Sequence, residues 1–201
     1  MAGERARVPF VGLTGGMGAG KSEALKALER LGAATLSSDA VVRELLTTGE
    51  VRDQLVERFG DAVAPNGEVD RAKVASVVFD RPEEREWLEG LLWPRVGQRV
   101  VEWREEIERR DPPPRAAVVE VPLLFESGME SAFDKTIAVV ADEAVREKRA
   151  GERGHEGVAS RTARQLPQEE KAHRADYTVR NDGDLDELGD RLSDVLARMG
   201  T

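Results

Sequence analysis

The residues best suited to chemistry lie near the amino end, in the stretch Gly15-Gly16-Met17-Gly18-Ala19-Gly20-Lys21-Ser22. This stretch follows the Gly-x-x-x-x-Gly-Lys-Ser pattern of a phosphate-binding loop. Its glycines let backbone N–H groups approach an anion closely, and a helix that starts after the loop adds partial positive charge. In this pattern Lys21 reaches the β- and γ-phosphates of a nucleotide, and the Ser22 hydroxyl ligates Mg²⁺.

The flanking residues separate phosphate binding from its alternative, a glycine-rich turn with an ordinary surface lysine. Residues 10–14 form a short apolar run, which indicates a buried strand. The apolar residues at positions 24, 25, 28 and 31 have helical spacing, and Gly32 is placed to end that helix. Strand, glycine loop and helix are the arrangement in which the motif binds phosphate, so the sequence predicts a nucleotide site.

Composition excludes several other classes of function. The net charge is −9 and no basic run stands out, which argues against a protein that wraps nucleic acid. The absence of cysteine excludes disulfides, thiolate metal sites and cysteine nucleophiles, and two histidines are too few for a zinc site. No apolar run approaches the ~20 residues of a membrane span, and the amino end lacks the apolar core of a signal peptide. We therefore expect a cytoplasmic protein with no nucleic-acid or membrane partner.

A carboxylate follows the next predicted strand, at residues 33–37. Asp39 would stand at the carboxyl end of that strand, the edge where open α/β sheets place ligands. In one interpretation Ser38 or Asp39 simply caps the following helix. In the other, the Asp39 carboxylate faces the phosphate loop and orients an acceptor hydroxyl, takes its proton or holds a metal-bound water.

Residues 50–110 read as almost wholly helical. Asp70 is placed to cap one helix, Pro82 to open a long one, and Pro94 to break or kink it. This insertion would either pack on the sheet as a helical flank or form a subdomain that binds substrate, and both could be true.

The rest of the chain returns to strands. Residues 116–121, 135–140 and 176–180 are predicted strands, and residues 185–199 a closing amphipathic helix. Glu120 lies inside an apolar strand, so it needs a partner such as a metal-bound water, a substrate hydroxyl, or an Arg or Lys. The expected fold class is therefore α/β, a three-layer fold of the phosphate-loop NTPase type with a parallel sheet, a helical insertion and a small helical lid.

Arginines are frequent in the charged segment 146–174, among them Arg149, Arg153 and Arg161. Such a segment is often only a solvated pair of helices. Here a phosphate loop needs arginines to cover the transferring phosphate, and glycines beside short helices suit a lid that excludes water.

Taken together, these motifs closely resemble one family, dephospho-coenzyme A kinase. The likeness covers essentially the whole chain and rests on an ordered set of segments: residues 12–22, 37–43, 66–84 and 121–126, then 161–165, Lys171, 175–177 and Asn181. Two positions depart from the family pattern, which usually has a second aspartate at position 37 and a Leu-His-Pro sequence where Leu92-Trp93-Pro94 stands here.

The resemblance implies transfer of the ATP γ-phosphate to the ribose 3′-hydroxyl of dephospho-coenzyme A. It implies Asp39 as general base, Lys21 and Ser22 on ATP·Mg²⁺, and Arg149 as a lid arginine. Acceptor contacts would come from Arg43 and from the segment Pro122, Leu123, Leu124, Phe125 and Glu126. A different small-molecule or nucleoside monophosphate kinase is the first alternative. A GTPase switch is disfavoured because no Asn-Lys-x-Asp tetrad is present.

The expected organisation follows from the same resemblance. Residues 1–48, 115–145 and 175–201 would form the nucleotide-binding core, 49–114 the acceptor-binding insertion and 146–174 the lid. The protein is expected to be a monomer or a weak homo-oligomer.

Overall fold

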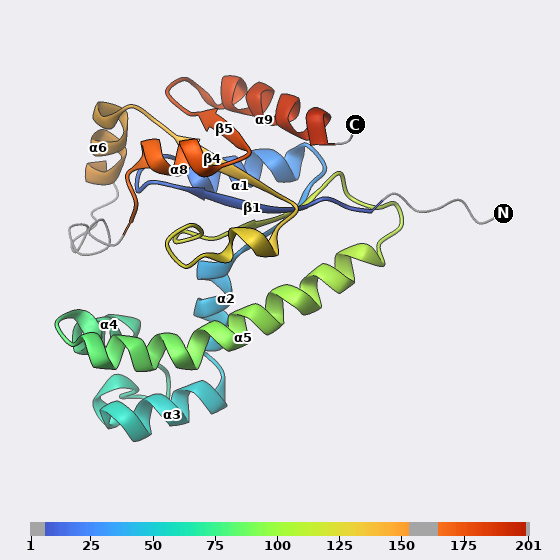
Figure 1. The fold of residues 1–201 in the computed structure, drawn as a ribbon. Helices are drawn as coiled ribbons and strands as arrows, with labels where there is room; N and C mark the ends of the chain where they lie inside the picture. The colour runs from blue at the N-terminus through green and yellow to red at the C-terminus, as the bar shows by residue number, and fades with distance from the viewer. Residues whose placement is uncertain (1–6, 153–164, 200–201) are drawn as a thin grey trace. The chain divides into compact units, whose positions relative to one another are not determined.

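The computed structural model describes residues 7–152 and 165–199. The chain forms two compact units, one made of the residues up to Ser37 and from Arg104 onward, the other of Ser38–Trp103. Figure 1 shows the elements of each unit along the chain. The sequence analysis expected a helical insertion at residues 49–114. The second unit, Ser38–Trp103, begins and ends earlier in the chain than this expected insertion.

The first unit is built on a parallel sheet, which has five strands within the described residues in the order β2-β3-β1-β4-β5. The strands are β1 (Phe10–Gly15), β2 (Ala34–Ser37), β3 (Ala117–Glu120), β4 (Lys135–Val140) and β5 (Tyr177–Arg180). All four pairings are parallel, so the carboxyl ends of the strands share one edge of the sheet. The predicted α/β class with a parallel sheet is confirmed.

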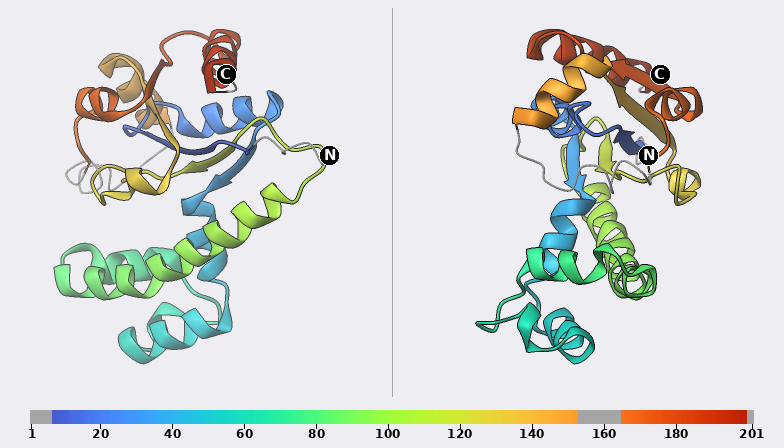
Figure 2. Two further views of the ribbon diagram at one scale, coloured as in Figure 1. Left: turned by 45° about the vertical axis from the view of Figure 1, so that its right-hand side comes forward. Right: turned by 90° about the vertical axis from the view of Figure 1, so that its left-hand side faces the viewer.

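Helices and loops cover both faces of this sheet. Along β1, Val11 and Leu13 pack with α1 (Lys21–Arg30) and α9 (Leu185–Met199) in one buried cluster. The alternate residue Gly12 faces the other way, where a Cβ would lie 2.9 Å from the Phe133 ring. Figures 1 and 2 show α1 and α9 on one side of the sheet and the residue 122–133 segment on the other. Three layers result, and the phosphate loop leaves a strand buried between two others.

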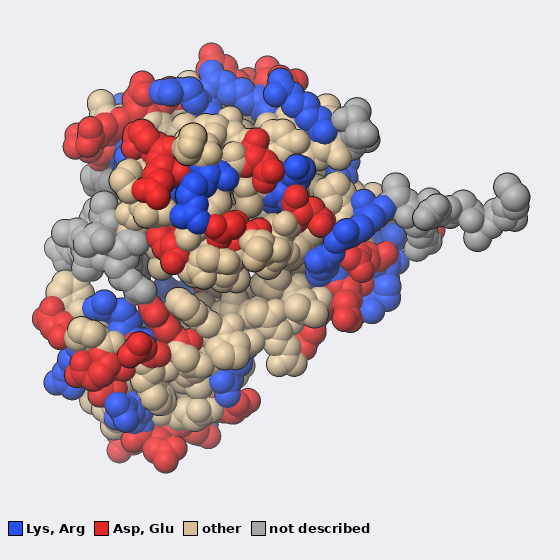
Figure 3. Space-filling view, viewed as in Figure 1, with Lys and Arg blue, Asp and Glu red and all other residues tan. Residues whose placement is uncertain are grey.

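Within the described residues, the other helical elements of the first unit follow β3 and β4. They are η2 (Met129–Ala132), α6 (Glu143–Glu152) and α8 (Gln168–Arg174), and the end of α5 (Pro82–Glu108) also belongs to this unit. Figure 3 shows acidic and basic side chains interspersed over the face it draws, with no continuous basic band there. None of the helices in the described residues is long and apolar enough to cross a membrane.

The second unit is helical, as the sequence predicts. It contains α2 (Ser38–Leu45), α3 (Gly49–Phe59), η1 (Asp61–Val63), α4 (Arg71–Phe79) and most of α5. Its buried cluster is Leu46, Val51, Leu55, Val63, Val74, Leu91 and Leu92. The Asp70 carboxylate caps α4 by accepting from the N–H groups of Ala72 and Lys73, which confirms that prediction.

Helix α5 begins at Pro82, as predicted, but it is not broken at Pro94. Proline removes one intrahelical donor, and the carbonyl that loses its partner is that of Gly90. Gly90 is exposed, and a Cβ there would meet nothing within 4 Å, so this turn lies on an open side of the helix. The Arg95 guanidinium also donates to the Leu91 carbonyl at 2.7 Å, which supports the same turn.

Asp176 joins the starts of β4 and β5, and we expect it to contribute stability that depends on pH. Its carboxylate accepts from the Thr136 N–H at 2.8 Å, the Thr136 hydroxyl at 2.9 Å and the Lys135 ammonium at 3.2 Å. Burial acts to raise the pKa of Asp176, but the Thr136 hydrogen bonds and Lys135 outweigh it, so this pKa lies below its ordinary value. Its contribution is therefore present above the unfolded-state pKa and is lost as pH falls through the folded-state pKa.

Replacing Asp176 with Asn should lower the free energy of unfolding by about 1 kcal/mol at pH 7, and by less near pH 3. Urea denaturation at both pH values measures the difference. Asp190→Asn, at an exposed position on α9, is the matched control. A gap between wild type and Asp176→Asn that is equal at both pH values would contradict this account.

Candidate functional site

The predicted phosphate loop spans the gap between β1 and α1. It begins at Gly15, the last residue of β1, and α1 starts at Lys21. Gly20 has φ 93°, a conformation that favours glycine, and a Cβ there would lie 2.0 Å from the Asn181 side-chain nitrogen. A Cβ on Gly15 would lie 2.3 Å from the Val139 carbonyl oxygen. The loop therefore needs glycine at these two positions to hold its shape.

Lys21 lies across this loop. Its ammonium donates to the carbonyl oxygens of Gly15 at 3.0 Å and Gly16 at 3.2 Å. Ser22 follows in the first turn of α1 and is exposed. The loop thus has a cation and a hydroxyl at the amino end of a helix, where unpaired N–H groups favour an anion.

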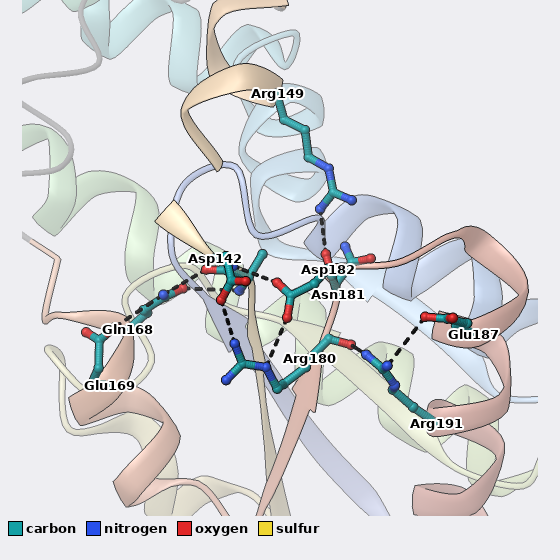
Figure 4. Close-up of polar contacts among 10 residues, drawn as sticks. Asp142, Arg149, Gln168, Glu169, Arg180, Asn181, Asp182, Glu187 and Arg191 are labelled. Atoms are coloured by element: carbon teal, nitrogen blue, oxygen red, sulfur yellow. Dashed lines mark hydrogen bonds and ion pairs between the residues drawn. The ribbon is translucent and has the colours of Figure 1, made fainter. Parts of the chain in front are cut away.

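Side chains from distant segments hold the far part of the loop. Arg146, on α6, donates from Nε to the Met17 carbonyl at 2.9 Å. Asn181 is 4% exposed and lies directly after β5. Its side-chain Nδ2 donates to the Ala19 carbonyl at 2.8 Å, and its backbone carbonyl accepts from the Arg149 guanidinium at 2.9 Å. Figure 4 shows Arg149 reaching Asn181 from its helix. Arg149 is therefore joined to the loop through Asn181.

Arg146 and Asn181 were not among the predicted site residues. Arg146 lies three positions before Arg149 on one helix, a spacing that puts both on one face. Asn181 follows a predicted strand at the ligand-binding edge of the sheet. The helical spacing and the position after a strand are sequence signals that could have identified Arg146 and Asn181.

A charged network joins the segments that follow β4 and β5. Arg180 pairs with Asp142 at 2.6 Å and with Asp182 at 2.9 Å, and Asp182 accepts from the Asp142 N–H at 2.6 Å (Figure 4). Burial acts to raise the pKa of Asp182, but the Asp142 N–H and the Arg180 guanidinium lower it below its ordinary value. A pocket of about 480 Å³ opens beside this network, lined by Ala144, Val145, Lys148, Arg149 and Asp182.

On the other side of β1, a hydroxyl meets a buried carboxylate. Glu120 is 7% exposed and accepts from the Ser37 hydroxyl at 2.8 Å. The strand register pairs Glu120 with Leu13 on one side and with Ser37 on the other. The structure therefore gives Glu120 a serine partner, which was not among the partners considered from the sequence.

Helix α2 carries Asp39 and Arg43. The prediction that Ser38 or Asp39 precedes this helix as its cap is wrong, because β2 ends at Ser37 and α2 begins at Ser38. Asp39 and Arg43 are both exposed and lie four positions apart, on one helix face. Both belong to the second unit, and the alignment of Asp39 with the phosphate loop stays a prediction.

The segment 122–126 has an inward and an outward part. Leu124 and Phe125 are buried, and the Arg174 guanidinium lies 4.9 Å from the centre of the Phe125 ring. Pro122 and Leu123 are partly exposed. The two buried residues support the segment, which leaves Pro122 and Leu123 as the better placed to touch a ligand.

Comparison with known proteins decides the family. The family model for dephospho-CoA kinase matches residues 9–187 of this chain. This chain belongs to the dephospho-CoA kinase family.

Relatives support the same assignment over nearly the full length. A dephospho-CoA kinase from Geobacillus kaustophilus is 35% identical over 191 residues, covering 92% of this chain and 94% of the relative. One from Streptomyces avermitilis is 35% identical over 192 residues, covering 93% and 92%. A crystal structure of a Thermus thermophilus protein is 31% identical with a TM-score of 0.80, covering 96% of this chain and 99% of the other. The dephospho-CoA kinase of Campylobacter jejuni is 21% identical with a TM-score of 0.65, covering 96% and 98%, and supports the fold.

One buried cation lies behind the segment 122–126. Lys171 is 0% exposed, and its ammonium lies 2.7 Å from the Pro122 carbonyl and 2.8 Å from the Glu126 carboxylate. Burial lowers the pKa of Lys171, and Glu126 acts in the opposite direction. Glu126, which the resemblance to dephospho-CoA kinases placed at the acceptor, is thus engaged inside the first unit.

Two predicted lid residues, Arg153 and Arg161, lie outside the described residues. Within residues 7–152 and 165–199, no group of three or more His, Cys, Asp or Glu side chains could hold a metal ion.

Gly20→Ala should damage the loop more than a helix substitution would. Alanine at φ 93° is strained and its Cβ meets Asn181, so we expect a KM for ATP raised about tenfold or more and a loss of about 1–3 kcal/mol of stability. Steady-state kinetics and urea denaturation measure the two effects. Gly189→Ala is the matched control, because a Cβ there meets nothing within 4 Å and α9 should become slightly more stable. A normal KM in Gly20→Ala would contradict the geometry.

Proposed function

We propose that this protein transfers the γ-phosphoryl group of ATP to the ribose 3′-hydroxyl of dephospho-coenzyme A, giving coenzyme A and ADP. Membership of the dephospho-CoA kinase family implies ATP as donor and a small-molecule acceptor. The observation that carries the proposal is the loop from Gly15 to Ser22, with its glycine geometry and its lysine, in a chain of this family.

The donor side of the site uses charge that is already in place. Backbone N–H groups of the loop and of the first turn of α1 bind the phosphates, and Lys21 moves from the loop carbonyls to the β- and γ-phosphates. Arg149 stabilises the charge that develops on the transferring group, and Arg146 holds Met17. The pocket beside Arg149 and Asp182 is where we place the base of the nucleotide.

Magnesium suits these residues. Mg²⁺ favours oxygen ligands and usually takes only one or two from protein, the rest coming from water and phosphate. The exposed Ser22 hydroxyl, in the first turn of α1, would hold it. When bound, Mg²⁺ supplies neutralisation of phosphate charge.

The acceptor side depends on Asp39 as general base. The Asp39 carboxylate takes the proton of the 3′-hydroxyl while that oxygen bonds to the γ-phosphorus, and the bond from phosphorus to the bridging oxygen of ADP breaks. Arg43, Pro122 and Leu123 contact the acceptor. We further propose that residues 49–114 bind the acceptor, that residues 146–174 act as the lid, and that the protein works in the cytoplasm as a monomer or weak homo-oligomer.

A direct assay tests the function. The purified protein is mixed with ATP, Mg²⁺ and dephospho-coenzyme A, and mass spectrometry detects the 3′-phosphorylated product. A panel of nucleoside monophosphates and small alcohols tests the alternative of another small-molecule kinase. Product from dephospho-coenzyme A should dominate; faster turnover of another acceptor would establish the alternative, and ATP binding without any product would contradict both.

A further inference from the structure

Lys171 is a fully buried cation to which the proposed chemistry gives no task. Lysine is almost never fully buried unless it is paired, because removing an ammonium from water costs several kcal/mol. The side chain is 0% exposed and comes from α8, a helix outside the phosphate loop. The contacts of its ammonium therefore indicate the role of this buried lysine.

The ammonium contacts β1 and the segment that follows β3. It lies 2.7 Å from the Pro122 carbonyl, just after β3, and 3.4 Å from the Thr14 hydroxyl, one residue before the loop begins at Gly15. The Thr14 hydroxyl in turn donates to the same Pro122 carbonyl at 3.3 Å. One cation thus ties the end of β1 to the start of the segment 122–126.

Glu126 supplies the counter-charge and extends the network. Its Oε1 lies 2.8 Å from the Lys171 ammonium and accepts from the Leu166 N–H at 2.8 Å. Its Oε2 is buried and has no hydrogen-bond partner within the described part of the chain. A carboxylate held in this way is costly without a cation, so Glu126 and Lys171 depend on each other.

We propose that Lys171 is a positioning residue for phosphoryl transfer, which fixes the Thr14–Gly15 end of β1 against Pro122. This inference rests on the proposed function and concerns the same site. Phosphoryl transfer depends on placement of the reacting groups, and a displacement of about 1 Å can cost 10²-fold in rate. A purely structural pair would behave differently, because well-packed apolar residues can often replace a buried ion pair without loss of stability.

The first test is Lys171→Met, which keeps the length of the side chain and removes the ammonium. We expect kcat to fall about 10- to 100-fold while the KM for ATP changes less than about threefold. Lys26→Met is the matched control, because Lys26 is exposed on α1 and forms an ion pair at 2.9 Å with Glu23 on the same helix. A kcat within about threefold of wild type in folded Lys171→Met overturns the proposal.

A chemical rescue separates positioning from general damage. The chain has no cysteine, so Lys171→Cys carries a single thiol. In the unfolded variant the thiolate displaces bromide from 2-bromoethylamine, which places an ammonium at the end of a side chain of lysine length, and the protein is then refolded. Recovery of most of the lost kcat supports the proposal, and a folded product without recovery overturns it. Wild type carried through the same steps is the control.

Three further outcomes are distinguishable. If Lys171→Met does not fold, the double variant Lys171→Met with Glu126→Gln removes both charges, and its kcat decides the question in the same way. If wild type forms no product from dephospho-coenzyme A, the proposed function has failed. If wild type is active and Lys171→Met is equally active, only the positioning role has failed.

Discussion

Asp39→Asn is expected to lower kcat about 10²- to 10⁴-fold while ATP binding stays almost unchanged. Asparagine keeps the size of the side chain and can still hydrogen-bond a hydroxyl, but it cannot take the proton that the 3′-hydroxyl must lose. A coupled assay for ADP release gives kcat, and calorimetric titration with ATP gives the binding constant.

The control for this variant comes from the same helix. Glu44→Gln removes an exposed carboxylate from α2, five positions along, and should leave turnover within about twofold of wild type. Unchanged turnover in Asp39→Asn would remove Asp39 from the chemistry. The base would then have to be sought among other carboxylates, of which Glu120 is the one at the neighbouring strand end.

Lys21→Ala is expected to lower kcat/KM for ATP about 10³-fold, with both kcat and KM affected. In the proposed mechanism the ammonium binds phosphate in the ground state and stabilises the charge that develops as the phosphoryl group leaves ADP. Its removal also deletes the hydrogen bonds to the carbonyls of Gly15 and Gly16, so the empty loop loses a support. Steady-state kinetics over a range of ATP concentrations separate the two parameters.

Lys26→Ala is the matched control for Lys21→Ala. Lys26 lies on the same helix, is exposed, and forms an ion pair at 2.9 Å with Glu23, which contributes little because both groups are close to solvent. Its kinetic constants should stay close to those of wild type. A Lys21→Ala enzyme with normal kcat/KM would show that the loop does not bind the donor in the way proposed.

Much of the first unit was predictable because its signals are local. The strand before the phosphate loop, the loop itself and the helix after it follow one another within about twenty residues, and each has its own pattern. The apolar runs that became β3 and β4 also read correctly, since a strand buried on both faces is apolar along its length. In the second unit, Asp70 and Pro82 likewise marked helix starts through local chemistry that the structure retains.

The wrong predictions came from local sequence rules that take no account of the neighbouring structure. Ser38 and Asp39 look like caps, but β2 passes into α2 without an intervening residue. Pro94 was expected to break or kink α5, and the break is wrong, since exposed Gly90 and the Arg95 side chain let the helix continue. In both cases the sequence signal was real and the surrounding structure overrode it.

The supports of the candidate site were the least predictable part. Asn181 meets Ala19 across 162 positions, and Lys171 meets Thr14 across 157. No periodicity or short motif links residues so far apart, because only the folded sheet and the segments that pack on it bring them together. Residue types pointed to the groups proposed to bind phosphate, while the groups that hold those in place appeared only with the fold.

The contact between Asn181 and Ala19 has a consequence for the order in which the enzyme becomes competent. All residues of the phosphate loop leave the ribosome early, yet their shape depends on an amide near the carboxyl end of the chain and on α9, which packs against α1. A nascent chain that stops before β5 contains the whole phosphate-loop motif but lacks the Asn181 side chain that supports it. Nucleotide capture should therefore be a late event in biosynthesis, and partly made chains should not sequester ATP.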